Sequence, residues 1–80
     1  MNLHIIYTET NMYLSKKQYS SWRDIQSEFP DFKTSLGPWT KEETVDFLQD
    51  EYSRLEPDAT TQVMELVNSA AAQREVTFRG

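Results

Sequence analysis

The residues of this sequence that could do chemistry are its carboxylates, and they are gathered in one stretch. Residues 41–58 hold seven acidic and two basic residues, whereas the rest of the chain holds six of each. That stretch therefore accounts for the whole net charge of −5. Clustered carboxylates can hold a cation, act as a general acid and base, or present a negative surface to a basic partner.

Four of these carboxylates fall on one side of an expected helix, opposite its apolar positions, and they are Glu42, Glu43, Asp46 and Asp50. Side chains three or four residues apart on a helix are about 5–6 Å from one another, which roughly matches the spacing of phosphates along a nucleic-acid strand. Phe47 lies toward the acidic side, and a large apolar group beside ordered charge is typical of an interface hot spot. We therefore expect a binding face composed of Glu42, Glu43, Asp46, Phe47, Asp50 and Glu51. A solvated helix face, with Phe47 covering a neighbouring element, fits the same pattern, and the residues leave both interpretations open.

The sequence gives little support for a catalytic or metal-binding site. The only histidine, His4, stands on an expected strand, where an ordinary hydrogen-bonded histidine is more common than a general base. The absence of cysteine excludes a thiol nucleophile, a disulfide and a zinc–thiolate site. Two glycines, Gly37 and Gly80, are too few for a phosphate-binding loop, and no calcium-loop pattern occurs. We expect no enzymatic activity, no metal site and no cofactor.

Length and composition predict one domain over residues 1–80 with a small core. The aromatic share of 12% argues against disorder. The sequence pI of about 4.7 disfavours nucleic acid and anionic membranes as direct partners. The lack of cysteine, of a signal peptide and of a long apolar stretch predicts a cytoplasmic protein.

The first half of the chain predicts a β-hairpin followed by a helix. Residues 3–8 are apolar and β-branched, typical of a strand, and residues 12–15 return as its partner. Leu3, Ile5 and Tyr7 are expected on one face of the first strand, with the face of Ile6 partly covered. A helix is predicted from Ser20 or Ser21 to just before Pro30.

The second half predicts two helices and a final strand. Residues 32–36 suggest a short edge strand, and Gly37–Pro38 a turn. Thr40 and Glu43 form a capping box for a helix from about Lys41 to Leu55. A third helix, capped by Asp58 or Thr60, should run to about Gln73. The expected buried stripe of this helix is Val63, Leu66, Val67 and Ala70. The inward residues of the final strand are expected to be Val76 and Phe78.

These elements predict the α+β class: a small antiparallel sheet, formed by the N-terminal hairpin and a C-terminal strand, packed against about three helices on one face. Trp22 and Trp39 are expected in the core or half-buried at its edge, since the core of so short a chain is thin.

Residues 18–57 resemble the MbtH-like proteins, small partners that activate adenylation domains of peptide synthetases. The sequence Gln18-Tyr19-Ser20-Ser21-Trp22 is similar to that family's Gln-aromatic-Ser-x-Trp segment, and Gly37–Pro38 and Leu55-x-Pro57 fall at similar spacing. The chain departs from the family at Arg23, where the family has Pro, and at Tyr52, Arg54 and Glu56, where it has Trp, Asp and Arg. The last 20 or so residues have no counterpart.

The function expected from these residues is that of a small acidic protein-binding module. It would inhibit or regulate a larger protein by occupying a basic surface, including one that normally holds nucleic acid. By analogy, phage-encoded anti-defence proteins of the anti-CRISPR type act in this way. The alternatives are a homodimeric structural or assembly protein and an MbtH-like activator of an adenylation domain.

Overall fold

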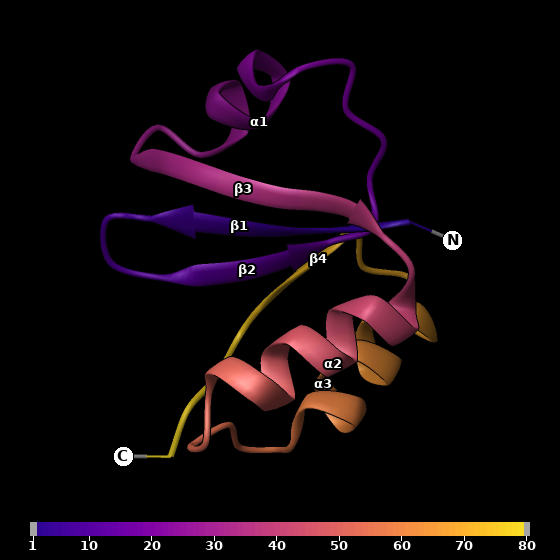
Figure 1. Cartoon of the computed structure of the whole chain (residues 1–80). Helices are drawn as coiled ribbons and strands as arrows, with labels where there is room; N and C mark the ends of the chain where they lie inside the picture. Colours follow the sequence, from indigo (N-terminus) through magenta and orange to yellow (C-terminus); the bar gives the residue numbers. More distant parts are fainter. Residues whose placement is uncertain (1, 80) are drawn as a thin grey trace.

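A four-stranded antiparallel sheet lies at the centre of the computed structural model, which describes residues 2–79. Met1 and Gly80, the two ends of the expected domain, lie outside the described residues. The strands are β1 (Leu3–Thr8), β2 (Met12–Ser15), β3 (Phe32–Trp39) and β4 (Gln73–Glu75), in the spatial order β3-β1-β2-β4 (Figure 1). The hairpin of β1 and β2 has the predicted bounds, and the α+β class is confirmed.

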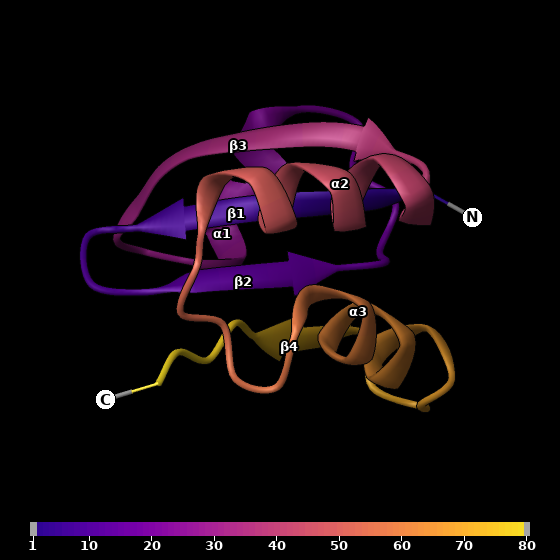
Figure 2. The same ribbon diagram turned by 60° about the horizontal axis from the view of Figure 1, so that its bottom comes forward.

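Helices cover both faces of the sheet, not one as the sequence predicted. α2 (Lys41–Glu51) and α3 (Ala59–Val67) lie side by side on one face, whereas α1 (Trp22–Glu28) lies on the other (Figure 2). The reason is in β1, which directs buried apolar side chains to both faces of the sheet. Leu3 and Ile5 face α2 and α3, while Ile6 faces α1. A strand with two apolar faces needs cover on both sides.

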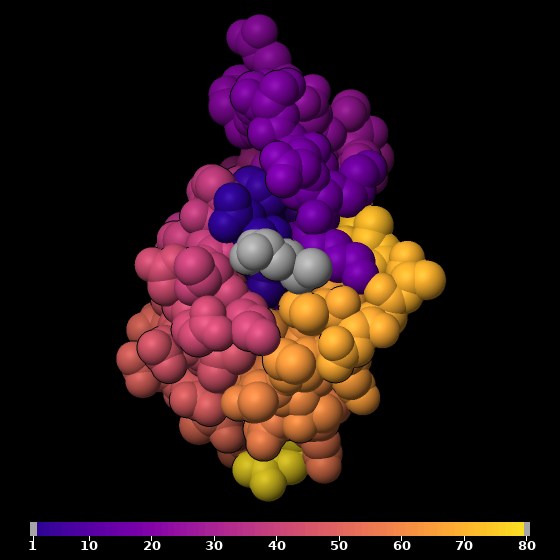
Figure 3. All heavy atoms as spheres, turned by 90° about the vertical axis from the view of Figure 1, so that its right-hand side faces the viewer, coloured from indigo at the N-terminus to yellow at the C-terminus, as the bar shows by residue number. Residues whose placement is uncertain are grey.

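The two faces bury very different amounts of apolar surface. The core between the sheet and α2 and α3 is the larger, and its largest fully buried side chains are Leu3, Ile5, Leu14, Leu48, Val63 and Leu66, each at most 1% exposed. The core under α1 contains only Ile6, Ile25 and Phe29, with Tyr13, Tyr19 and Phe32 around it. In Figure 3 the purple atoms of α1 and of the loop before it project from one end of the molecule.

Strand β3 passes straight through Gly37–Pro38, where a turn was predicted. Gly37 has a φ of 113°, and a Cβ at this position would lie 2.5 Å from the carbonyl oxygen of Leu3. A side chain would therefore force β1 and β3 apart. The pairing register shifts at the same place, between Leu3 and Ile5. The dipeptide therefore marks a β-bulge within an eight-residue edge strand, not the end of a shorter one.

Both helices of the second half end earlier than the sequence predicted. α2 stops at Glu51, and Leu55 instead forms an isolated β-bridge with Phe78. α3 stops at Val67, because Lys16 binds the chain that follows it. The Lys16 ammonium donates to the carbonyls of Leu66 and Ser69, and its backbone amide donates to Ala72. Ala70 is consequently exposed instead of buried. No helix within residues 2–79 combines the length and apolar character needed to cross a bilayer.

One buried side chain, Gln62 of α3, holds the C-terminal segment in place. Its Nε2 donates to the carbonyls of Pro57, at 2.6 Å, and Thr77, at 3.0 Å, and its Oε1 accepts from the amide of Thr77 at 3.0 Å. Every polar atom of this fully buried amide group is thus paired, as burial requires. The segment places Val76 in the core as predicted, but Phe78 remains 43% exposed.

Candidate protein-binding face

The predicted acidic residues lie on α2, and side-chain hydrogen bonds stabilise the start of that helix. The Thr40 hydroxyl accepts from the Glu43 amide at 3.1 Å, and the Glu43 carboxylate accepts from the Thr40 amide at 2.9 Å. This reciprocal capping box satisfies two backbone donors at the helix start. The helix then buries Thr44 and Leu48 against the sheet. The opposite side of the helix therefore faces solvent.

The five acidic residues of the expected binding face, which we call the acidic ridge, are all exposed: Glu42, Glu43, Asp46, Asp50 and Glu51. The ion pairs found within residues 2–79 are Lys17–Glu28 and Arg74–Glu65, and neither involves the acidic ridge. Glu43 is the member with a structural task, since its carboxylate closes the capping box. The other four carry negative charge that no cation of the described chain offsets through an ion pair.

Phe47, the sixth residue of the expected face, is half-buried beside the ridge. Its ring makes an edge contact with Trp39, at 5.2 Å between centroids, and another with Tyr52, at 6.4 Å. It also packs on the larger core. Phe47 therefore joins α2 to the end of β3, as the covering interpretation of the sequence describes.

Phe47 belongs to a row of aromatic side chains that runs along one side of α2. Tyr52 continues the row to Phe78 with a centroid distance of 5.6 Å, and its hydroxyl lies 3.0 Å from that of Tyr7. Burial raises the pKa of the Tyr7 phenol well above its usual range, and the hydrogen bond with Tyr52 adds to the effect. The Tyr7 phenol is therefore neutral at physiological pH.

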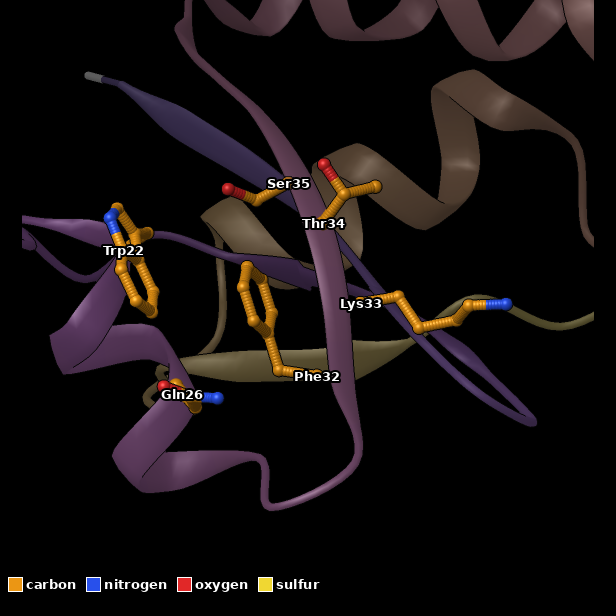
Figure 4. A pocket seen from close by; sticks show the side chains of 6 residues that line it. All are labelled: Trp22, Gln26, Phe32, Lys33, Thr34 and Ser35. Carbon is orange, nitrogen blue, oxygen red and sulfur yellow. The ribbon is translucent and has the colours of Figure 1, made fainter.

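The two tryptophans, expected in or near the core, differ in position. Trp39 is half-buried against the larger core, as expected. Trp22 is 54% exposed, and its ring lies 5.3 Å from the Arg23 guanidinium. It borders a hollow between α1 and β3, where the ring of Phe32 points toward the α1 side of β3 and Lys33 points away (Figure 4). The prediction for Trp22 was wrong because its ring lies at the margin of this hollow and beside Arg23, and does not pack on the core under α1.

His4 lies on the α1 side of the sheet and is 9% exposed. Its ring meets the edge of Tyr19 at a centroid distance of 5.0 Å, and burial lowers its pKa. Within residues 2–79, no three His, Asp or Glu side chains come close enough together to hold a metal ion.

Sequence reasoning missed a groove between α2 and α3. It is lined by Val45 of α2 and Met64 of α3, with Glu42 and Asp46 of the acidic ridge at its margin. The sequence placed Val45 in the buried stripe and Met64 at the edge of its own stripe, so each residue was assigned to packing. Only the side-by-side placement of the two helices reveals that both side chains remain half-exposed along one line.

The comparisons leave the acidic ridge without a described counterpart. No known protein family, no curated protein and no solved structure matches the chain significantly. Of the segments that resemble the MbtH-like proteins, residues 18–21 form the loop before α1, Trp22 begins that helix, and Gly37–Pro38 forms the bulge of β3.

Proposed function

We propose that this chain is a protein-binding module that regulates or inhibits a larger protein by docking its acidic ridge on a basic surface. The observation that carries the proposal is that the ridge is helical and exposed, and makes no ion pair within the described chain. Carboxylates spaced along a rigid helix can meet cations spaced along a partner without first breaking internal pairs.

The distribution of charge supports this proposal. The segment that contains α2 carries the full net charge of −5, whereas the remainder of the chain is neutral overall. Such a polarised molecule is oriented by the field of a basic partner as it approaches, which speeds association and makes it sensitive to salt. A basic surface that normally binds nucleic acid has the complementary charge, so the module would compete with nucleic acid there.

Charge reversal on the ridge tests the proposal. The variant Asp46→Lys/Asp50→Lys changes two exposed carboxylates that make no hydrogen bond or ion pair, and it spares the capping residue Glu43. The control Glu9→Lys/Asp31→Lys makes the same change in net charge at exposed carboxylates away from α2. Each protein is immobilised, incubated with lysate at low salt, and eluted with rising salt or with heparin as a competing polyanion.

The wild type and the control should retain the same proteins and release them to salt and to heparin, whereas the ridge variant should retain none of them. Circular dichroism confirms that each variant is folded. Equal retention by the ridge variant would refute the proposal, because the captured proteins would then bind elsewhere on the molecule.

A homodimeric assembly protein is the second candidate, and the exposure of Trp22 is the observation that favours it. Trp22 is 54% exposed at the margin of the hollow beside β3, and large exposed aromatic side chains are enriched at interfaces. This candidate expects a dimer in sedimentation experiments that persists at high salt and dissociates in Trp22→Ser. A monomer at all concentrations would exclude it.

A further inference from the structure

The seam between α2 and α3 forms a groove with an apolar floor. Val45 of α2 and Met64 of α3 line one part, and Val67 of α3 lines an adjoining hollow at the start of α2. All three side chains are half-buried, and those of Val45 and Val67 pack on the larger core. In Figure 3 the surfaces of α2 (pink) and α3 (orange) meet along this seam.

The floor is apolar because each helix has apolar residues beyond its fully buried stripe. On α3, Met64 and Val67 follow the buried residues Val63 and Leu66 by one position each. On α2, Val45 stands one turn before the buried Leu48. Side chains in such positions cover the core with one side and leave the other side open to solvent.

The size of the groove indicates which kind of ligand it can bind. Its volume of about 240 Å³ is below the roughly 300–1,000 Å³ of pockets that enclose small ligands. It is also open along the seam, so it does not surround a ligand. An aliphatic side chain presented by another protein fits such a groove, because the partner supplies the remaining cover.

The margin of the groove defines the charge of that partner. Glu42 and Asp46 of the acidic ridge line it, and neither forms an ion pair within the described chain. Lys41 lies at the same end of α2 and is the cation of the lining. A segment with basic residues on both sides of an aliphatic residue would place its cations beside the ridge and its apolar side chain on the floor.

We propose that the groove between α2 and α3 receives one aliphatic side chain from a basic segment of the partner, whose Lys or Arg residues pair with Glu42 and Asp46. This inference rests on the proposed function and assigns the apolar contact to Val45 and Met64. Phe47, the residue expected from the sequence, already contacts Trp39 and Tyr52. Charge then steers the partner, and the groove adds the contact that depends on shape.

Two capped synthetic peptides test the inference. One has Leu between two pairs of Arg, and the other has Ser in place of Leu. Binding is followed by nuclear magnetic resonance, through the methyl signals of Val45, Met64 and Val67. The Leu peptide should bind roughly tenfold more tightly than the Ser peptide, because an aliphatic group in an apolar site contributes about that factor. It should also shift these methyl signals more than those of the buried core.

Variants of the groove should remove the preference for Leu and leave the attraction to charge. Met64→Gln keeps the length of the side chain, and Val45→Thr keeps its shape, so each adds polarity with little change in volume. Both should bind the two peptides with equal affinity, close to that of the wild type for the Ser peptide. Thr61→Gln, at an exposed position of α3, is the matched control and should keep the preference.

The outcomes separate the inference from the proposed function. Equal binding of the two peptides to the wild type, or an unchanged Leu preference in both groove variants, overturns the groove inference and leaves the ridge proposal standing. If Asp46→Lys/Asp50→Lys binds both peptides as well as the wild type, the ridge proposal fails. A Leu preference that Met64→Gln removes would still support the groove in that case.

Discussion

The two faces of the sheet are held by different kinds of interaction. The face under α2 and α3 is apolar and continuous, with side chains such as Leu48 and Val63 completely buried. The face under α1 buries few apolar groups, and a polar network surrounds them. In that network Glu28 accepts hydrogen bonds from Lys17, Tyr19 and Gln73, and Tyr19 also bonds Ser15.

This difference separates the stability of the fold from the attachment of α1. Burial of apolar surface supplies most of the free energy of folding, so α2, α3 and the sheet should unfold as one unit. Exposed polar contacts each contribute little. The seven-residue helix α1 should therefore open locally without loss of the rest. The proposed binding face lies on the more stable side, where a rigid helix can hold its carboxylates at fixed spacing.

The largest effect is expected from Leu48→Ala. Leu48 is completely buried at the centre of the larger core, where neighbouring elements cannot collapse onto the vacated space. The free energy of unfolding should fall by about 4 kcal/mol, near the upper end for such truncations. Urea unfolding followed by far-ultraviolet circular dichroism measures this change. A loss below about 2 kcal/mol would mean that this core is as adaptable as the one under α1.

Ile25→Ala should have a smaller and more local effect. Ile25 is 3% exposed and is the buried residue of α1, but a short helix can shift inward to fill the space. We expect a loss of about 2 kcal/mol. Hydrogen exchange should show faster exchange of the α1 amides and nearly unchanged exchange in α2 and β1. Uniform acceleration across all three elements would show that α1 is part of the same cooperative unit.

The N-caps of the two helices offer a third comparison. Thr40→Ala removes one half of the α2 capping box and should cost about 1 kcal/mol. Ser21→Ala should cost less, because the Asp24 carboxylate still accepts from the amide and hydroxyl of Ser20 at the start of α1. Chemical unfolding of both variants provides the test. The comparison fails if Ser21→Ala is the more damaging substitution.

Mild acid should weaken the α1 face first. Burial lowers the pKa of His4 below its usual 6.5, so the unfolded chain binds a proton more readily and stability falls as the pH drops below that value. Partial burial acts to raise the pKa of Glu28, but the hydrogen bond and charge of Lys17 outweigh it and keep the pKa low. A hydrogen bond from the Ser20 hydroxyl lowers the pKa of Asp24. These two carboxylates stabilise the fold above their unfolded-state pKa values and lose that contribution as the pH falls through their lower folded-state values.

Amide exchange and the fluorescence of Trp22, followed from pH 7 downward, measure this effect. His4→Gln should remove the part that begins just below about pH 6.5. The idea is wrong if the signals of α2 change before those of α1, or if the His4→Gln variant shows the same dependence just below that pH.

Periodicity predicted the elements well where local residues decide them. The alternation in β1, the hairpin partner β2 and the Thr40–Glu43 capping box all rest on neighbours in sequence, and the structure confirms them. The errors arose where distant residues decide. Gly37 is required by the approach of Leu3, and the end of α3 by hydrogen bonds from Lys16. No local pattern reports such long-range contacts.

The candidate site divides in the same way. Helical spacing predicts that Glu42, Glu43, Asp46 and Asp50 share one side of α2, and all five carboxylates of the acidic ridge are exposed in the structure. The half-burial of Phe47 depends on Trp39 and Tyr52, and the groove depends on the distance between two helices. Both features therefore depend on contacts between elements that are distant in the sequence.

The hydrogen bonds of the Gln62 amide group determine which substitutions the C-terminal segment can tolerate during evolution. This group recognises the C-terminal segment through the peptide amide and carbonyl of Thr77, groups that every residue except proline presents in the same form. These two hydrogen bonds therefore do not depend on which side chain stands at position 77. Substitutions at position 77 other than proline keep these two hydrogen bonds, although they can remove the one that the Thr77 hydroxyl donates to the Glu56 carbonyl. Gln62 itself has no equivalent replacement among the other amino acids. A comparison of diverged descendants should find Gln62 invariant and the residue at position 77 variable.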